Sequence, residues 1–183
     1  MEFEDEDAYL ADQERQHAED RLRCDNPVLH GWLAERRAAF PAWAEGAERG
    51  EGVEPYPYDD VWDFGVESVD RLERLIRATF TSYEDARARE DGPFMLGAAW
   101  YLGEVHNRAC GTVWQVHPDA RKFPPYKVQP FVTIPWERKD EYEDEEGVED
   151  DARPLYGPVN GICQLFKWGP DRHLRDDMNR YAL

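Results

Sequence analysis

The chain has 183 residues, of which 41% are hydrophobic and 13% aromatic, and its formal net charge is -18. So many bulky apolar side chains can build a core, which excludes global disorder. The negative charge repels phosphates and argues against direct binding of nucleic acid. No run approaches the roughly 20 consecutive apolar residues of a membrane helix, so we expect no membrane partner.

Three further features bear on where the protein works. The cysteines, Cys24, Cys110 and Cys163, are few and far apart, which indicates free thiols in a reducing compartment. The acidic N-terminus differs from the basic and then apolar start of a signal peptide, and we therefore predict a cytoplasmic protein. Arginine outnumbers lysine by 18 to 4, which indicates a GC-rich bacterial source.

The negative charge is concentrated in two segments. Residues 1–20 carry nine acids and one base, and residues 137–151 carry ten acids and two bases, so each segment has a net charge of -8. The rest of the chain is close to neutral. These segments are either hydrated runs that keep the protein soluble or surfaces that attract a basic protein and speed its encounter.

In chain order, the first predicted element is a helix over residues 8–23, which contain neither glycine nor proline. Asn26 and Pro27 match a cap followed by proline at the first helical position, and they predict a second helix. Apolar residues continue this helix to about Phe40, and Pro41 is expected to end or kink it.

A loop is predicted over residues 44–60, which hold three glycines and two prolines without apolar periodicity. We therefore divide the chain into an acidic, helical N-terminal arm, residues 1–60, and an α+β main domain, residues 61–183, in one compact unit. The main domain begins with a predicted helix over 69–90, which Ser68 is expected to cap.

The segment 94–110 is apolar on almost every side and predicts a buried helix, which Gly111 ends. Residues 112–117 and 128–134 alternate in polarity and predict two strands of a hairpin. Because Pro130 cannot donate to a ladder, we expect the second strand at an edge of the sheet or bulged.

The last predicted elements are a short helix over 158–168 and a final helix from Asp171 through Tyr181. Helices that precede a small antiparallel sheet indicate an α+β fold. We therefore predict a mainly helical α+β protein with an antiparallel hairpin at about residues 112–134.

Glu104, His106 and His117 are the candidate catalytic residues. Burial in the apolar helix would raise the pKa of Glu104 toward neutrality, where a carboxyl group can act as acid or base. Arg108 follows at the spacing of an ion pair, so a structural role for Glu104 is the other interpretation. His106 and Cys110 are one turn apart, but they match no zinc pattern, and we predict no metal site.

Phosphate-binding glycine loops, nucleophile elbows and HExxH motifs are all absent from the sequence, and no cofactor is predicted. Partner binding is the other candidate activity. Aromatic side chains beside acids make good interface anchors, and Phe123 and Tyr126 stand in a proline-rich loop where we expect exposure. The acidic part of this candidate surface comprises Glu141, Glu143, Asp144, Glu145 and Glu146.

The run Tyr101-Leu102-Gly103-Glu104, followed by Gly111 and then Trp114 on a strand, resembles a pattern of small uncharacterised bacterial α+β proteins. In those proteins a helix reading "YxGE" ends at glycine and leads into a tryptophan-bearing strand. The resemblance covers residues 66–136, and this chain has one glycine where a pair is usual. Some of the similar domains are immunity-like, so the resemblance implies an interaction module and no catalytic residues.

We therefore predict a non-catalytic protein-interaction module, immunity-like in form, that binds a basic protein partner through its acidic segments. The first alternative is a small hydrolase or transferase with a Glu/His site. The second is a homo-oligomeric structural protein, in which the N-terminal helices pack on a second copy as in a homodimer.

Overall fold

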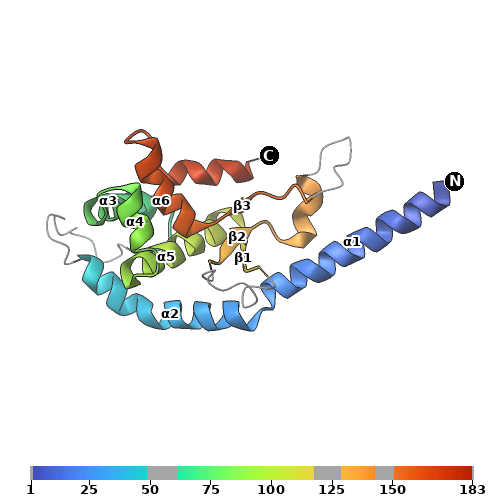
Figure 1. Cartoon of the computed structure of the whole chain (residues 1–183), viewed down its shortest axis with the longest axis horizontal. Coiled ribbons are helices and arrows are strands. Elements are labelled where there is room, and N and C mark those ends of the chain that lie inside the picture. The colour runs from blue at the N-terminus through green and yellow to red at the C-terminus, as the bar shows by residue number, and fades with distance from the viewer. Residues whose placement is uncertain (1, 49–61, 118–128, 143–150, 183) are drawn as a thin grey trace.

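The computed structural model describes residues 2–48, 62–117, 129–142 and 151–182, and helices dominate it (Figure 1). The α-helices are α1 (Glu2–Cys24), α2 (Pro27–Glu48), α3 (Ser68–Thr79), α4 (Tyr83–Ala88), α5 (Pro93–Cys110) and α6 (Pro158–Trp168). The 3-10 helices are η1 (Trp136–Glu141) and η2 (Leu174–Tyr181). Three short strands, β1 (Val113–Gln115), β2 (Phe131–Thr133) and β3 (Leu155–Tyr156), form one antiparallel sheet. The predicted fold class is confirmed.

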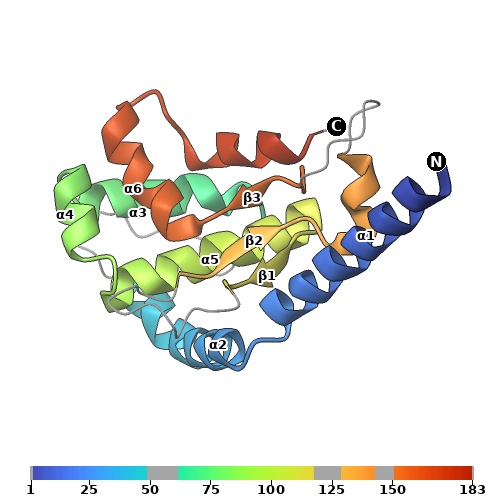
Figure 2. The same ribbon diagram turned by 45° about the vertical axis from the view of Figure 1, so that its right-hand side comes forward.

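Helix α5 runs through the middle of the molecule, with α2 on one side and α3 and α6 on the other (Figure 2). It is buried on almost every side because its residues are apolar or small. At Gly103 a Cβ atom would lie 2.1 Å from the ring of Trp114, so the absent side chain lets β1 approach α5. Gly111 ends the helix with a left-handed φ of 67°, and the predicted helix and its cap are confirmed.

The sheet has the order β1-β2-β3, with Trp114 opposite Val132 and Val132 opposite Tyr156. The predicted hairpin is therefore confirmed. The prediction that its second strand lies at an edge is wrong, because β3 pairs with β2 and makes it the central strand. Pro130 stands just before β2 and so removes no bond from the ladder.

Two helix predictions need correction. Helix α2 continues through Pro41 to Glu48, with Pro41 on its exposed side, where water can hydrate the carbonyl that the proline leaves unpaired. The predicted helix over 69–90 is two helices, because the chain is extended at Phe80 and Ser82 starts α4 by accepting a bond from the Asp85 amide. Ser68 is not a side-chain cap, since its hydroxyl donates to the carbonyl of Gly65.

Among the described residues, helix α1 contacts the body along its second half, and its N-terminal half projects away from the described body (Figure 1). The attachment includes a backbone bond of 3.1 Å from the Val116 amide to the Arg23 carbonyl. Within the described ranges, no helix combines the length and the apolar character needed to cross a membrane.

Candidate functional site

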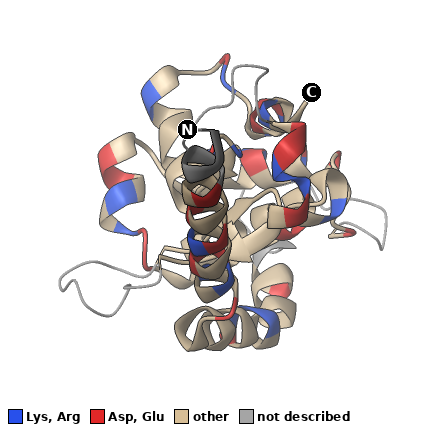
Figure 3. Ribbon diagram, turned by 90° about the vertical axis from the view of Figure 1, so that its right-hand side faces the viewer, with Lys and Arg blue, Asp and Glu red and all other residues tan. Residues whose placement is uncertain are grey.

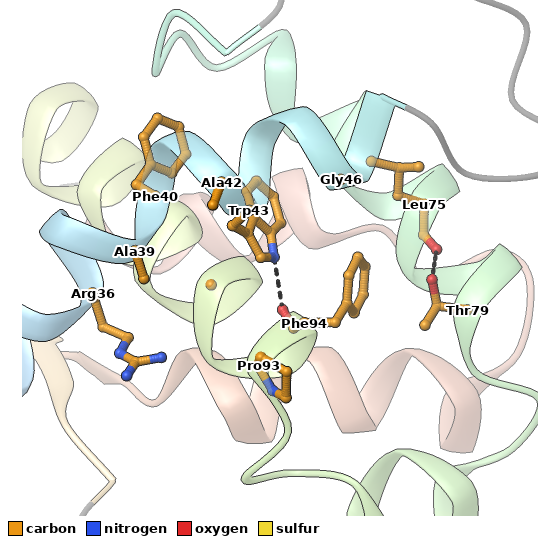
Figure 4. Close-up of a pocket in the computed structure, with 11 residues that line it drawn as sticks. Arg36, Ala39, Phe40, Ala42, Trp43, Gly46, Leu75, Thr79, Pro93 and Phe94 are labelled. Atoms are coloured by element: carbon orange, nitrogen blue, oxygen red, sulfur yellow. Dashed lines mark hydrogen bonds between the residues drawn. The ribbon is translucent and has the colours of Figure 1, made fainter.

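An open pocket of about 450 Å³ lies where α2, α3 and α5 meet (Figure 4). This volume falls within the range of roughly 300–1,000 Å³ that is usual for small-molecule sites. The residues that line it are mostly apolar: Arg36, Ala39, Phe40, Ala42, Trp43 and Gly46 from α2, Leu75 and Thr79 from α3, and Pro93, Phe94 and Gly97 from α5. Arg36 is the single ionisable side chain of this lining.

Small residues on two helices create the hollow. Ala39, Ala42 and Gly46 follow one another at helical spacing along α2, so this side of the helix carries little side-chain volume. On α5, a Cβ atom at Gly97 would lie 2.2 Å from the Trp43 ring, so the glycine lets the indole rest directly on the helix backbone. A Cβ atom at Gly46 would meet nothing within 4 Å, because this position faces open space.

An aromatic cluster supports the inner wall of the pocket. Phe40 lies 5.2 Å from Trp100 and 5.8 Å from Tyr101, measured between ring centroids. Phe64 stacks on Tyr101 at 4.7 Å, and its φ of 60° is a conformation that residues with a side chain seldom adopt. The Phe64 amide donates to the Tyr101 hydroxyl at 2.9 Å, which holds the strained residue in place. These contacts make the wall rigid.

The polar groups of the pocket differ in how well they are satisfied. The Trp43 indole donates to the Phe94 carbonyl at 3.0 Å, and the Thr79 hydroxyl donates to the Leu75 carbonyl at 2.8 Å. The Arg36 side chain is only 15% exposed, and its Nε has no partner. Its one hydrogen bond is a long contact of 3.5 Å to Glu35, which is itself 72% exposed. Arg36 therefore brings an incompletely paired positive charge to an apolar pocket.

Glu104 and Arg108 do not form the expected ion pair. The Glu104 carboxylate accepts a bond of 2.8 Å from the Trp114 indole, which comes within reach because Gly103 leaves room for the ring. The Arg108 guanidinium instead lies 3.9 Å from the centroid of the Phe64 ring, a favourable cation–π position. Glu104 thus serves to fix β1 against α5.

His106 is fully buried on another side of α5. Its Nδ1 lies 3.2 Å from the Tyr181 hydroxyl, and its ring stacks on Tyr156 at 4.4 Å. Burial, together with the nearby charge of Arg180, lowers the pKa of His106 to about 3, so the ring is neutral at physiological pH. His117 is exposed beyond the end of β1. Glu104 and His106 therefore have different partners, and no bond joins them in the described part of the chain.

The cysteines are protonated thiols, and the described residues form no metal-binding group. Burial raises the pKa of Cys24, Cys110 and Cys163, so all three thiols are protonated and weakly nucleophilic at neutral pH. No three His, Cys, Asp or Glu side chains gather into a metal-binding group within the residues that the structure covers.

Six of the nine acids of the two acidic segments whose side chains the structure describes are paired with bases of the same chain. In the first segment, Asp12 pairs with Arg15, Glu19 with Arg23 and Asp20 with Arg153; in the second, Asp140 pairs with Lys139, Glu141 with Arg138 and Asp151 with Arg153. Figure 3, which faces the N-terminal end of α1, shows basic and acidic residues close together on this helix. Among the acids of these segments whose side chains the structure describes, Asp7, Glu14 and Glu137 lack such a partner.

Of the predicted partner-binding residues, only Glu141 belongs to the described part of the chain. It accepts a bond of 2.6 Å from Arg138, and this bond lowers the pKa of its carboxyl group. The other six lie outside the described residues: Phe123, Tyr126, Glu143, Asp144, Glu145 and Glu146.

Arg36 is not among the predicted site residues, although the sequence carries a signal for it. Trp32 lies one turn before Arg36 and Phe40 one turn after it, so the arginine interrupts the apolar stripe of α2. A charge in such a stripe needs either a partner or a solvent-filled pocket, and the sequence shows neither.

The comparisons with known proteins add no relative. The chain matches no protein-family model, no curated protein and no solved structure.

Proposed function

We propose that the chain is a non-catalytic protein-interaction module whose projecting helix α1 binds a basic protein partner. The observation that carries the proposal is the outer half of α1, which extends from the body (Figure 1) and carries exposed apolar and acidic side chains. Tyr9 is 54% exposed and Leu10 is 53% exposed. Asp7 lies on this half and Glu14 at the middle of the helix, and neither makes an ion pair with another described residue.

Apolar anchors flanked by charge are the usual composition of a specific protein interface. The aromatic ring of Tyr9 and the side chain of Leu10 would supply buried contact area. Asp7 and Glu14 would steer a basic surface toward it and fix its orientation, because complementary charge raises association rates. The partner therefore needs basic residues around an apolar groove.

The inner half of α1 holds the helix in a defined direction. Asp20 is buried and accepts bonds from Arg153 at 2.6 Å and from Gln115 at 2.7 Å. His17 stacks on Trp136 with a ring separation of 5.3 Å and an angle of 6°. A helix anchored in this way presents its outer half at a lower entropic cost than a free tail.

Charge favours a different protein over a second copy of this chain. Residues 1–20 have a net charge of -8, so two such arms would repel each other. The homo-oligomeric alternative therefore needs another surface. Sedimentation velocity measures this directly, and a dimer that persists when α1 is altered would favour that alternative.

The experiment compares capture of partners by two variants of the full chain under native conditions. Tyr9→Ser combined with Leu10→Ser removes the anchors, and Asp7→Asn combined with Glu14→Gln removes the unpaired charges. We expect the first variant to lose its partner and the second to bind more slowly and with less sensitivity to salt. Circular dichroism checks that each variant remains folded.

Trp168→Ser is the matched control, because Trp168 is 66% exposed on α6, far from α1 in the fold. It should leave the captured proteins unchanged. Identical capture by the wild type and by the Tyr9/Leu10 variant would contradict the proposal. The immunity-like form of this function, implied by the resemblance of residues 66–136, further requires that the captured protein is toxic and that this chain inhibits it.

A further inference from the structure

We infer that the pocket between α2, α3 and α5 binds a small amphipathic carboxylate, with its carboxylate at Arg36 and its apolar part between Trp43 and Phe94. Figure 4 shows Arg36 at one end of the pocket and Thr79 at the other, with Trp43 and Phe94 between them. The inference is independent of partner binding by α1, because the two sites share no residue.

The polar side chains of the pocket are satisfied except at Arg36. Trp43 and Thr79 already donate to carbonyl groups of the protein. Arg36 is the charged side chain of this lining, and the hydrogen bond that it makes among the described residues is a contact of 3.5 Å from Nη2 to the exposed Glu35. A guanidinium group stays charged in proteins, so an anion is the ligand group that completes this end.

The N-terminus of α5 adds to the attraction for an anion. Pro93 and Phe94, the first two residues of this 18-residue helix, line the pocket. Gly92 at the cap position has no side chain to satisfy the first amides, and the first turn contains no acid. The Arg36 side chain extends from α2 toward Pro93 (Figure 4). The partial positive charge of the helix end and the guanidinium therefore act on the same end of the pocket.

The rest of the pocket favours a ligand whose remaining part, beyond the carboxylate, is apolar. Beyond Arg36 the lining consists of aromatic rings, aliphatic side chains and small residues. The volume of about 450 Å³ accommodates a medium-chain or aromatic acid and excludes a folded partner segment of substantial size. Carboxylate and phosphate groups can both pair with a planar guanidinium through two parallel bonds. A carboxylate carries a single negative charge, which matches the single guanidinium of this lining, so the ligand is a carboxylate on a small apolar molecule.

The test uses three ligands that share one chain length: decanoate, decanol and decyltrimethylammonium. Binding to the full-length protein is measured by calorimetry, and the indole N–H resonance of Trp43 reports occupancy of the pocket. We expect decanoate to bind at least tenfold more tightly than either of the other two. Equal affinities for the three ligands, or no saturable binding of decanoate, would overturn the inference.

Two pairs of variants locate the site. Arg36→Gln should weaken decanoate binding by roughly ten- to hundredfold, the effect of one charge-assisted pair, and should leave decanol binding unchanged. Arg37→Gln, which changes an exposed arginine next to it, should alter neither. Unchanged decanoate affinity in Arg36→Gln would place the anion elsewhere and overturn the inference.

Gly46→Phe fills the pocket without a clash, since a Cβ atom there meets nothing within 4 Å. Gly31→Phe is its matched control, because Gly31 lies on the same helix, equally open, outside the pocket. We expect only Gly46→Phe to abolish binding of decanoate. If Gly46→Phe instead disrupts self-association or partner capture and the protein does not bind decanoate, the occupant is a protein and the inference is wrong.

Discussion

The guanidinium groups of Arg153 and Arg36 are both largely removed from water, yet their surroundings differ. Arg153, at the junction of α1 with the sheet, is 2% exposed and donates to Asp20, to Asp151 and to the carbonyl of Ile134. Arg36, in the pocket between α2 and α5, has a buried Nε without a partner. The hydrogen bonds of Arg153 are therefore supplied by the protein itself, whereas Arg36 can still bind a ligand.

The acidic segments are not merely hydrated runs, because some of their carboxylates bind buried basic groups such as Arg153. Asp20 belongs to the acidic N-terminal segment but is buried against Arg153 and Gln115, where it attaches α1 to the body. Trp136 lies beside this pair, with Arg153 at 5.0 Å and Lys139 at 5.3 Å from its ring. One part of each acidic segment therefore has a structural role, and the outer part of α1 remains available for a partner.

The largest expected effect on stability comes from removing Asp20, a carboxylate that pairs with the buried Arg153. Asp20→Ala leaves Arg153 buried with one carboxylate fewer and leaves Gln115 without its acceptor. We expect the free energy of unfolding to fall by about 3 kcal/mol, as measured by urea denaturation. A loss below about 1 kcal/mol would mean that water replaces Asp20 easily and that the junction is not a fixed support for α1.

His106 is a third buried basic side chain, and it differs from both arginines. A histidine with an unpaired ring nitrogen can remain neutral, whereas an arginine cannot. Its folded-state pKa of about 3 lies below the unfolded value of 6.5, so the unfolded state binds the extra proton. Stability that is present above pH 6.5 is therefore lost as the pH falls from there toward 3. Linkage predicts a loss of about 3 kcal/mol between pH 7 and pH 4.5 from this residue.

Urea denaturation of the wild type and of His106→Gln across this pH range measures the effect. The glutamine keeps a polar contact for Tyr181 and does not titrate, and the exposed histidines are common to both proteins. The difference in stability between the two proteins should therefore shrink as the pH falls. Parallel pH profiles would show that His106 is protonated inside the fold and would remove the contrast with arginine.

A smaller effect is expected at Arg36. Arg36→Met removes a guanidinium that has no complete set of partners and keeps an unbranched apolar stem. We expect a change in the free energy of unfolding of less than about 1 kcal/mol, in either direction. A larger loss would show that the protein itself supplies the partners of Arg36, as it does for Arg153. The contrast between the two arginines would then be wrong.

The smallest effect is expected for an arginine–carboxylate pair in full contact with water. Arg138 donates to Glu141 at 2.6 Å, but both side chains are exposed and the pair is screened by solvent. Glu141→Gln should leave the urea midpoint unchanged. A clear shift of the midpoint would indicate that η1 depends on this pair.

Much of the fold could be predicted because its signals are local. The burial of α5 follows from a contiguous apolar run, and its end follows from Gly111 at a left-handed position. The hairpin follows from two alternating segments. β3 could not be predicted, because two residues carry no periodicity and their pairing depends on β2 being in place.

The candidate sites were less predictable, because their chemistry depends on residues far apart in the chain. The partner of Glu104 is Trp114, brought close by the gap at Gly103, whereas helical spacing pointed to Arg108. Asp20 and Arg153 are separated by 133 positions, so no local pattern links them. The pocket at Arg36 depends on three helices and on small residues whose common surface appears only after packing.

Local patterns along the chain are enough to predict a packed core, the central helix α5, the hairpin and the concentration of acids in two segments, since each depends on neighbours in the chain. Contacts between distant segments set which acids are paired, which histidine stays uncharged and which arginine is incompletely paired. The physical reason is that the free energy of a charge depends on burial and on partners within a few ångströms, and both are set by contacts between distant segments.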